Sequence, residues 1–216
     1  MPAKPDTLAA AKKAANFLII RTAAVRGSHG RHWYGDAKKD LSALCLTRGW
    51  DWVTFCKVMG ATSPQCPVWM NVRHTIRVMS ALESHDNATD AVNSVPGLTA
   101  GIRKSTIRAI ESRDFSTLGP KTAMFARNVS GDLSAITLDT WMGQMIGLSA
   151  KRSGSVTSKV VSKPYKATIN HVARSLGWEP AEVQAAVWTY ATENLGNSSH
   201  GGSDFQEMIE KAIRTA

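Results

Sequence analysis

The apolar residues of this chain recur at the spacing of an α-helix along almost its whole length, and no convincing run alternates as a β-strand would. Proline at first helical positions supports several of the starts, as at Pro64, Pro120 and Pro180. The sequence therefore predicts an all-α fold. The expected helices cover residues 6–25, 36–48, 52–60, 64–83, 99–114, 120–127, 139–150, 164–176, 179–195 and 203–215.

The chain is strongly basic: 26 Lys and Arg residues against 17 Asp and Glu residues give a net charge of +9 and a pI near 9.7. Such a balance favours a polyanionic partner, nucleic acid first and an anionic membrane surface second, although a soluble basic protein without such a partner has the same composition. No run of about eighteen apolar residues exists, so we expect no membrane-spanning helix.

The three cysteines, Cys45, Cys56 and Cys66, are an odd number at wide spacings. This pattern predicts buried free thiols in a reducing, cytoplasmic setting. The spacings are too wide for a zinc or iron–sulfur site, so the sequence predicts neither of these metal centres.

The stretch 114–142 carries two residues that could do chemistry. It predicts a short hairpin around Gly119, a helix that begins at Pro120, a polar loop and a second helix that begins at Asp139. Lys121 is either a surface lysine that touches phosphate or a nucleophile, since apolar neighbours and the helix dipole both disfavour its charged form. Asp139 is either an ordinary helix N-cap or a carboxylate that stabilises a developing cation such as an oxocarbenium ion.

Several other polar residues allow a binding interpretation and a structural one. Gln65 and Asn71 lie near a helix start, where polar groups meet a ligand or satisfy local backbone groups. Gln184 and Trp188, four residues apart on one helix, predict core packing with one polar handle. The glycine-rich loop 26–35 presents its aromatic and imidazole groups either to a ligand or to the core. The remaining candidates are cations that could neutralise phosphates or lie in solvent: Arg103, Lys104, Arg108, Lys151, Arg152, Lys159 and Lys163.

The residues LGPKTAMFARNVSGDLSAITLDTWM resemble the hairpin and catalytic segment of the helix-hairpin-helix DNA glycosylases of the endonuclease III type. Those enzymes typically carry a hairpin of the form LPGVGxKTA, followed after a loop by VDTH. Here FSTLGPKTA stands at the hairpin and LDTW at the second segment, with the family's lysine-to-aspartate spacing. The segment SPQCPVWMN also resembles the family's segment whose glutamine enters the space left by a flipped base.

The resemblance implies a role for each matched residue: Lys121 as the Schiff-base lysine of the bifunctional members, Asp139 as the catalytic aspartate, and Gln65 as the gap-filling glutamine. It also implies a two-lobed glycosylase fold with the active-site cleft between the lobes. We expect an N-terminal helix in residues 1–30 that packs on a domain of residues 31–216, with the hairpin at about 99–128. The expected contacts to DNA or to the base are Gln65, Asn71, Arg103, Lys104, Thr117, Leu118, Gly119, Thr122, Trp141, Lys151 and Arg152.

The sequence departs from the family pattern at three places. Ser116 and Thr117 replace the first Pro and Gly of the hairpin, and Trp141 follows the aspartate–threonine pair where the family usually has His. The C-terminal iron–sulfur cysteines of many relatives are absent. The resemblance therefore implies no metal or cofactor beyond a structural monovalent cation at the hairpin. It further implies a monomer and a duplex DNA partner that carries a modified or damaged base.

The function expected from this resemblance is a DNA glycosylase that flips and excises a damaged or modified base, with associated abasic-site lyase activity through the lysine. Two alternatives stay open. The segments WYGDAKKD, ATSPQCPVWMN and VQAAVW resemble small phage-encoded relatives, so the same fold could serve base hypermodification of phage DNA in the host cytoplasm. A non-catalytic helical DNA-binding module accounts for the basic charge and the hairpin equally well.

Overall fold

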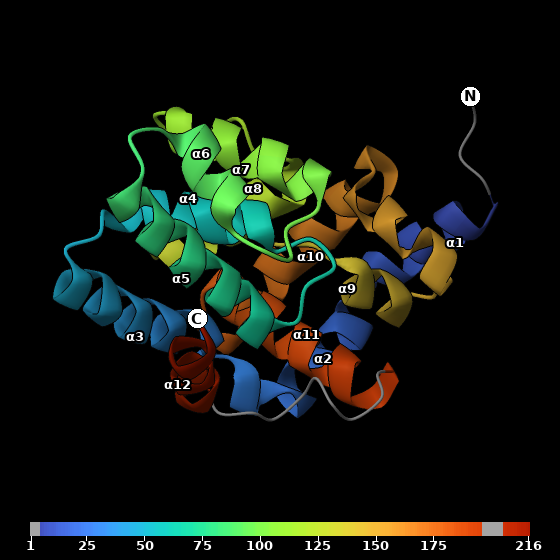
Figure 1. The fold of residues 1–216 in the computed structure, drawn as a ribbon. Helices are drawn as coiled ribbons and strands as arrows, with labels where there is room; N and C mark the ends of the chain where they lie inside the picture. The colour runs from blue at the N-terminus through green and yellow to red at the C-terminus, as the bar shows by residue number, and fades with distance from the viewer. Residues whose placement is uncertain (1–4, 196–204) are drawn as a thin grey trace. The chain divides into compact units, whose positions relative to one another are not determined.

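The structure, a computed structural model, describes residues 5–195 and 205–216, and every regular element within these two ranges is a helix (Figure 1). The predicted all-α class is thereby confirmed. The expected start of the last helix at residue 203 lies outside the described residues. The elements are α1 (Pro5–Ala14), α2 (Phe17–Arg26), η1 (Ser28–Gly30), α3 (Trp33–Arg48), α4 (Trp52–Thr62), α5 (Val68–Ser84), α6 (Ala88–Ser94), α7 (Ala100–Glu111), α8 (Pro120–Ser130), α9 (Thr140–Met145), η2 (Ala150–Thr157), α10 (Lys159–Leu176), α11 (Pro180–Leu195) and α12 (Phe205–Thr215).

The chain divides into two compact units, each of which is discontinuous in sequence. Of the described residues, the first unit contains 5–34 and 132–195, and the second contains 35–131 and 205–216. The division therefore falls in the first turn of α3 and after Gly131, rather than at residue 30. The N-terminal helices share a core with the C-terminal third of the chain.

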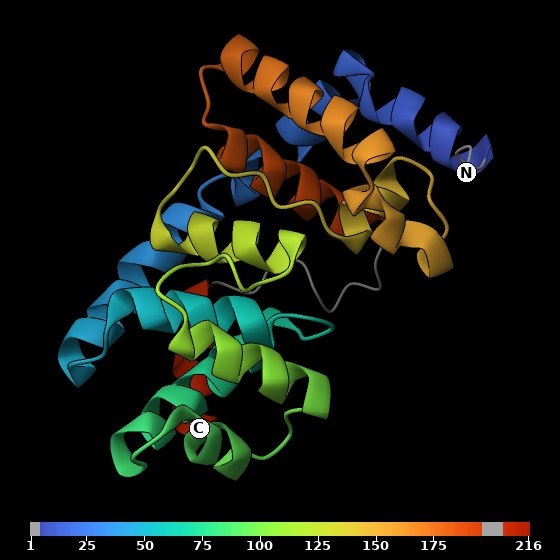
Figure 2. The ribbon, with the colours of Figure 1, turned by 90° about the horizontal axis from the view of Figure 1, so that it is seen from above.

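The core of the first unit is formed by α10 and α11 together with α1, α2 and α9 (Figure 2). α1 and α2 pack against α10, and α2 and α9 pack against α11. On α10, four fully buried side chains follow the helical period: Val161, Tyr165, Ile169 and Val172. This packing places the start of α9, where Asp139 lies, on the core of the unit.

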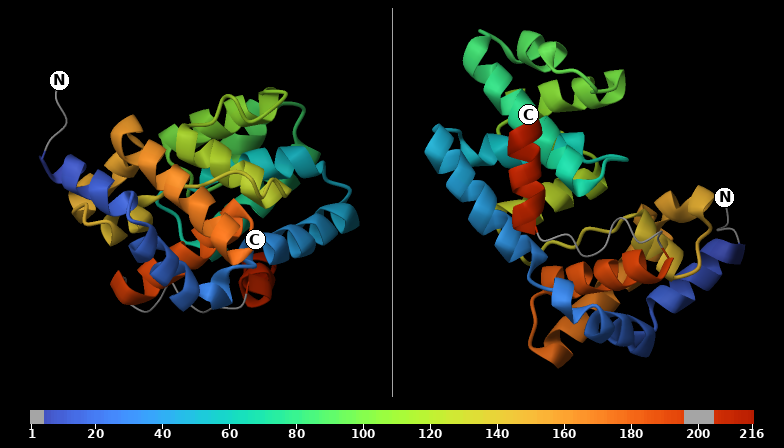
Figure 3. Two further views of the ribbon diagram at one scale, coloured as in Figure 1. Left: turned by 180° about the vertical axis from the view of Figure 1, so that it is seen from behind. Right: turned by 60° about the horizontal axis from the view of Figure 1, so that its bottom comes forward.

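The centre of the second unit is α4, which packs against α5, α7 and α8. All residues from Phe55 to Thr62 are buried, so this helix has no solvent-exposed side over its last two turns. Gly60 allows α8 to approach closely, since a Cβ at this position would lie 2.9 Å from the Ala126 Cβ. α12 lies along α5 (Figure 3), where the Arg73 Nε donates to the Thr215 carbonyl oxygen at 2.7 Å.

The single helix predicted over residues 6–25 is wrong, because the chain breaks at Asn16. The Asn16 side chain accepts hydrogen bonds from the N–H groups of Leu18 at 3.1 Å and Ile19 at 3.2 Å, and so caps α2. An asparagine amide satisfies the free donors of a new helix better than it continues an existing one. The sequence therefore makes two helices where one was expected.

α5 begins at Val68 rather than at Pro64. Pro67 disfavours helical backbone at the residue before it, which prevents the expected continuous helix. The intervening residues form a turn in which Gln65 has a φ of 55°. Ser63 ends α4, where its hydroxyl donates to the Gly60 carbonyl oxygen at 2.9 Å.

The basic loop expected over residues 151–163 is helical. η2 covers most of it, and α10 begins at Lys159, five residues before Pro164. Val156 and Val161 are fully buried in the core of the first unit. A proline at this position removes one helical hydrogen bond, and the burial of the two valines outweighs that loss.

Other differences are smaller. The polar connection expected over residues 83–97 contains the short helix α6, which is capped by the Asn87 side chain and held by the buried Ala91 and Val92. Four further helix ends shift by three to five residues from the predicted ones: α3 begins at Trp33, α7 ends at Glu111, α8 ends at Ser130 and α9 ends at Met145.

We predict that Gly60→Ala destabilises the second unit by about 1–3 kcal/mol, because the new methyl group meets the Ala126 Cβ and a backbone carbonyl of α8 at 2.9 Å. Gly101→Ala is the matched control, since nothing lies within 4 Å of a Cβ there and alanine in a helix is favoured by about 0.5–1 kcal/mol. Urea unfolding followed by circular dichroism measures both variants. Equal stabilities of the two would contradict the close helix contact.

Candidate functional site

The hairpin of residues 112–119, between α7 and α8, is anchored to α4. The Lys57 side chain is 4% exposed, and its Nζ donates to the Ser112 carbonyl oxygen at 2.6 Å and to the Ile110 carbonyl oxygen at 3.4 Å. A lysine at a helix C-terminus thus satisfies carbonyl groups that have no helical donor. Leu118 is buried in a small apolar cluster between α4, α7 and α8, so it packs the hairpin rather than presenting a surface contact.

The N-terminus of α8 has no side-chain cap. Gly119 occupies the N-cap position and has no side chain that could accept from the first-turn N–H groups. The Thr122 hydroxyl donates to the Gly119 carbonyl oxygen at 3.0 Å. Lys121 lies in the same turn with a half-buried side chain. An uncapped helix start beside an ammonium group is a favourable place for a phosphate oxygen.

Asp139 is the N-cap of α9, and both of its carboxylate oxygens accept hydrogen bonds. Oδ1 accepts from the Met142 N–H at 3.1 Å, and Oδ2 accepts from the Trp188 indole Nε1–H at 2.9 Å. The residue is half-buried. Donors from two different helices fix the plane of the carboxylate.

A buried polar network lies next to Asp139 in the first unit. The Tyr34 hydroxyl donates to the Gln184 Oε1 at 2.8 Å, and the Gln184 Nε2 donates to the Met142 Sδ at 3.6 Å. Burial raises the pKa of the Tyr34 phenol, and the negative charge of Asp139 raises it further. Burial and then Asp139 likewise raise the pKa of the Tyr165 phenol. Both tyrosines therefore stay protonated at neutral pH, and the carboxylate is close enough to both to affect them.

The two candidate catalytic residues belong to different units, Lys121 to the second and Asp139 to the first. Within the first unit, the Trp188 indole donates to Asp139, and the network of Tyr34 and Gln184 lies beside it. Lys121, in the second unit, lies in the first turn of α8, directly after the hairpin. Three further expected contacts differ in exposure. Thr117 and Lys151 are exposed, and Trp141 is half-buried in the first turn of α9.

Gln65 is exposed in the turn between α4 and α5. Its φ of 55° lies in the left-handed region, and within the described residues it is the one non-glycine residue with a positive φ. Residues other than glycine adopt this conformation at an energetic cost, and such strain clusters at functional sites. An exposed glutamine held in this way is a suitable candidate for a contact with DNA.

Two of the expected DNA contacts have their polar groups engaged inside the protein. Asn71 is 2% exposed, its Oδ1 accepts from the Thr62 hydroxyl at 2.6 Å, and its Nδ2 donates to the Met59 carbonyl oxygen at 3.2 Å. The Arg152 guanidinium forms an ion pair with Asp6 of α1. Both side chains therefore hold helices together. This is the structural interpretation of Asn71, whereas for Arg152 it is neither of the two interpretations that the sequence left open.

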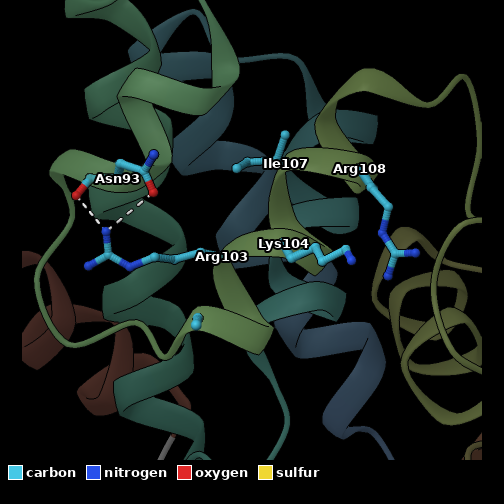
Figure 4. Close-up of a pocket in the computed structure, with 6 residues that line it drawn as sticks. Asn93, Arg103, Lys104, Ile107 and Arg108 are labelled. Atoms are coloured by element: carbon cyan, nitrogen blue, oxygen red, sulfur yellow. Dashed lines mark hydrogen bonds between the residues drawn. The ribbon is translucent and has the colours of Figure 1, made fainter.

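Arg103 is similarly engaged, at the C-terminal end of α6. Its guanidinium nitrogens donate to the carbonyl oxygens of Asn93 at 2.6 Å, Val95 at 3.0 Å and Leu98 at 3.0 Å. Figure 4 shows the contact with Asn93. The planar guanidinium suits several fixed acceptors at once. Arg103 therefore organises the chain between α6 and α7.

The neighbouring cations of α7 are exposed. An open pocket over this helix is lined by Asn93, Ala100, Ile107 and the stems of the basic residues, and Figure 4 shows Lys104 and Arg108 extending away from Arg103. Lys104 and Arg108 are both exposed. Their exposure is compatible with both interpretations, a contact with phosphate or a position in solvent.

The glycine-rich loop before α3 packs on the first unit. Tyr34 is 5% exposed. The His29 Nε2 lies 2.7 Å from the Glu193 Oε1, and the His32 Nδ1 lies 3.2 Å from the Glu182 Oε1, both on α11. Tyr34 therefore packs onto the core, whereas the side chains of His29 and His32 stay largely exposed.

Among residues 5–195 and 205–216, no group of three or more His, Cys, Asp or Glu side chains could hold a metal ion. The cysteines are free thiols, and burial raises the pKa of Cys45 to about 12 and that of Cys66 to about 11. They stay protonated at neutral pH and are poor metal ligands and nucleophiles in that form.

In the part of the chain that the structure describes, no helix is apolar enough over a sufficient length to span a bilayer.

Sequence reasoning missed the roles of Lys57 and Trp188. Lys57 lies inside the apolar run WVTFCKVMG. Its position between apolar residues is the one sequence signal that its ammonium group binds acceptors inside the protein. For Trp188 the sequence predicts core packing with a polar handle, and it does not identify the acceptor. That acceptor, Asp139, is 49 residues away in the sequence, so no local pattern connects the two.

We predict that Lys57→Met loosens the hairpin, because the Ser112 carbonyl group loses its donor while the apolar stem is kept. The expected loss is about 1–3 kcal/mol of unfolding free energy. Hydrogen exchange followed by mass spectrometry should show faster exchange over residues 112–119. Lys104→Met, at an exposed position of α7, is the control and should leave this exchange unchanged. Unaltered hairpin exchange in Lys57→Met would refute the anchor.

Trp188→Phe keeps an aromatic ring but removes the donor to the Asp139 Oδ2. Hydrogen bonds to charged groups contribute about 1.5–3 kcal/mol, and we expect a loss of this size. Trp178→Phe is the matched control, because the Trp178 ring packs on the same core and lies 4.7 Å from the Arg31 guanidinium. Denaturant unfolding of both variants measures the difference. Equal losses would argue that the indole N–H is unimportant for Asp139.

The chain matches one known protein family over most of its length. The model of a family of unknown function, DUF7178, matches residues 10–195, which include the hairpin, Lys121 and Asp139. No curated protein matches the chain, and no solved structure matches it.

Proposed function

The chain belongs to the family of unknown function DUF7178, and we propose that this member is a DNA glycosylase with abasic-site lyase activity. It would flip a damaged or modified base out of duplex DNA and excise it. One observation carries the proposal. A lysine at the uncapped start of a hairpin helix is followed eighteen residues later by a carboxylate that caps α9 and accepts from an indole N–H. A protein that only binds DNA needs neither group.

In the proposed reaction the Lys121 amine attacks C1′ of the flipped nucleotide, and the bond from C1′ to the base breaks with its electron pair leaving on the base. Asp139 stabilises the positive charge that develops at the sugar or accepts the proton that the attacking amine loses. The carboxylate suits either role because donors on two helices fix its plane. Its half-buried site also strengthens electrostatic interactions relative to water.

The DNA would be held by groups that are exposed in the structure. The first-turn N–H groups of α8 suit a phosphate, and Lys104 and Arg108 add positive charge on α7. Lys151 adds charge on η2. The exposed Gln65, in its left-handed turn, would enter the space left by the flipped base.

Borohydride trapping on duplex DNA with a single abasic site tests the proposal. We expect a covalent adduct with the wild-type protein and none with Lys121→Gln, because glutamine forms no imine. On duplex DNA that still carries the modified base, Asp139→Asn should slow base excision by about 10²–10³-fold, the usual effect of removing one electrostatic stabiliser. Lys39→Gln, which removes an exposed lysine of α3, is the control and should form the adduct at the wild-type rate.

The outcomes separate the candidates. An adduct that persists in Lys121→Gln would overturn the lysine assignment. If the wild-type protein forms none, mass spectrometry of the bases and nucleosides after incubation with modified DNA decides the rest. Release of a free base would indicate a lysine-independent glycosylase, and no change in any base would indicate a non-catalytic DNA-binding module.

Base hypermodification is the second candidate, and the hairpin favours it. The Asp114 carboxylate accepts from the Ser116 N–H at 2.8 Å, and hydrogen bonds from Ser116 hold the pKa of Asp114 below its usual value. An ionised carboxylate near the tip weakens a grip on phosphate. In the same nucleoside analysis, a transferase would leave the modified pyrimidine attached to its sugar and heavier.

A further inference from the structure

α10 concentrates positive charge on one of its faces. With 3.6 residues per turn, the side chains of Lys159, Lys163, Lys166 and Arg174 fall within an arc of about 80°. The opposite side of the helix carries the buried stripe that contains Tyr165 and Ile169. The helix sequence contains no Asp or Glu. We call these four cations the α10 ridge.

The ridge cations have no internal partners. Lys159, Lys163 and Arg174 are exposed and Lys166 is half-buried, and none of the four forms an ion pair or a side-chain hydrogen bond among the described residues. Other basic groups of the first unit are paired instead: Arg152 contacts Asp6, and His29, Arg31 and His32 contact glutamates of α11. The ridge therefore keeps its full charge available to an external anion.

The neighbouring helix adds to this charge. α1 packs along α10 (Figure 2) and carries the exposed Lys12 and Lys13 in its last turn. Lys151, in the helix η2 that precedes α10, is also exposed. Positive charge thus continues from the ridge onto the adjoining elements of the same unit.

The dimensions of the ridge suit a nucleic-acid backbone. Fifteen residues of helix separate Lys159 from Arg174, a rise of about 22 Å. One strand of B-DNA presents a phosphate about every 3.4 Å along the axis, so the ridge spans about six phosphates. An anionic membrane would call for large apolar side chains beside the cations. On α10 the exposed large apolar side chain is Val160, which lies outside the ridge arc.

We propose that the α10 ridge is a sequence-independent contact surface for the backbone of duplex DNA. The proposal rests on the proposed function for the identity of the partner, but it adds a second surface to the hairpin and the candidate catalytic residues. Each lysine that neutralises a phosphate releases a counterion, so binding through the ridge weakens as salt rises. The ridge adds affinity and carries no base selectivity.

Fluorescence anisotropy with an unmodified 20-base-pair duplex, titrated in KCl, tests the ridge. For Lys159→Gln/Lys163→Gln we expect the slope of log K against log salt to fall in magnitude by about 1.8, because each phosphate contact contributes about 0.9. Lys39→Gln/Arg48→Gln is the control of equal charge. It removes two exposed cations of α3, where Asp36 and Asp40 are interspersed, and should leave the slope unchanged.

A ridge variant with the wild-type slope would overturn the proposal, and so would an equal fall in the control. Binding of vesicles that contain phosphatidylserine is measured in parallel. Loss of vesicle binding with an unchanged DNA slope would assign the ridge to a membrane instead. Because no bond breaks in this assay, a ridge-dependent slope without any borohydride adduct would support the ridge while refuting lysine-dependent excision.

Discussion

Protein covers α4 on every side over its last two turns, and the arrangement of the second unit depends on this burial. A helix with no solvent-facing side must be surrounded by α5, α7 and α8 together, which restricts where the hairpin between α7 and α8 can lie. Gly60 brings α8 close, and Lys57 donates to the end of α7. One buried helix therefore anchors both sides of the hairpin and determines where the unit presents Lys121.

The ends of the helices show which polar groups are free for another role. Within the described residues, five helices are capped by a side chain that accepts from a first-turn N–H: Asn16, Asp51, Asn87, Thr99 and Asp139. Gly119 provides no such acceptor at α8, so an external anion can take that place. Asp139 differs in another way, because one oxygen caps α9 while the other accepts from Trp188. A carboxylate held at both oxygens is preorganised, as electrostatic catalysis requires.

Much of the fold can be predicted from local sequence, since helical periodicity and a first-turn proline such as Pro120 act within a few residues. The break at Asn16 is equally local, but the apolar stripe on both sides of it masks the signal. The early start of α10 is different, because it depends on the burial of Val161 against other helices. The candidate site divides in the same way. Asp139 belongs to a local motif and can be identified from the sequence. Its contact with Trp188 joins residues 49 positions apart, and helical periodicity cannot predict a contact over that separation.

The net charge of +9 counts every cation equally, but in the structure some cations bind internal acceptors and others are exposed to solvent. Arg103 and Arg152 each satisfy fixed internal acceptors, to which a planar guanidinium with five donors is suited. The lysines of the α10 ridge have flexible stems and a single charge, which adapt to phosphates in any register. Under the proposed function, such contacts would hold the duplex with little regard to sequence. Selection of the base would then depend on the residues around Asp139, where an indole and two buried phenols surround one carboxylate.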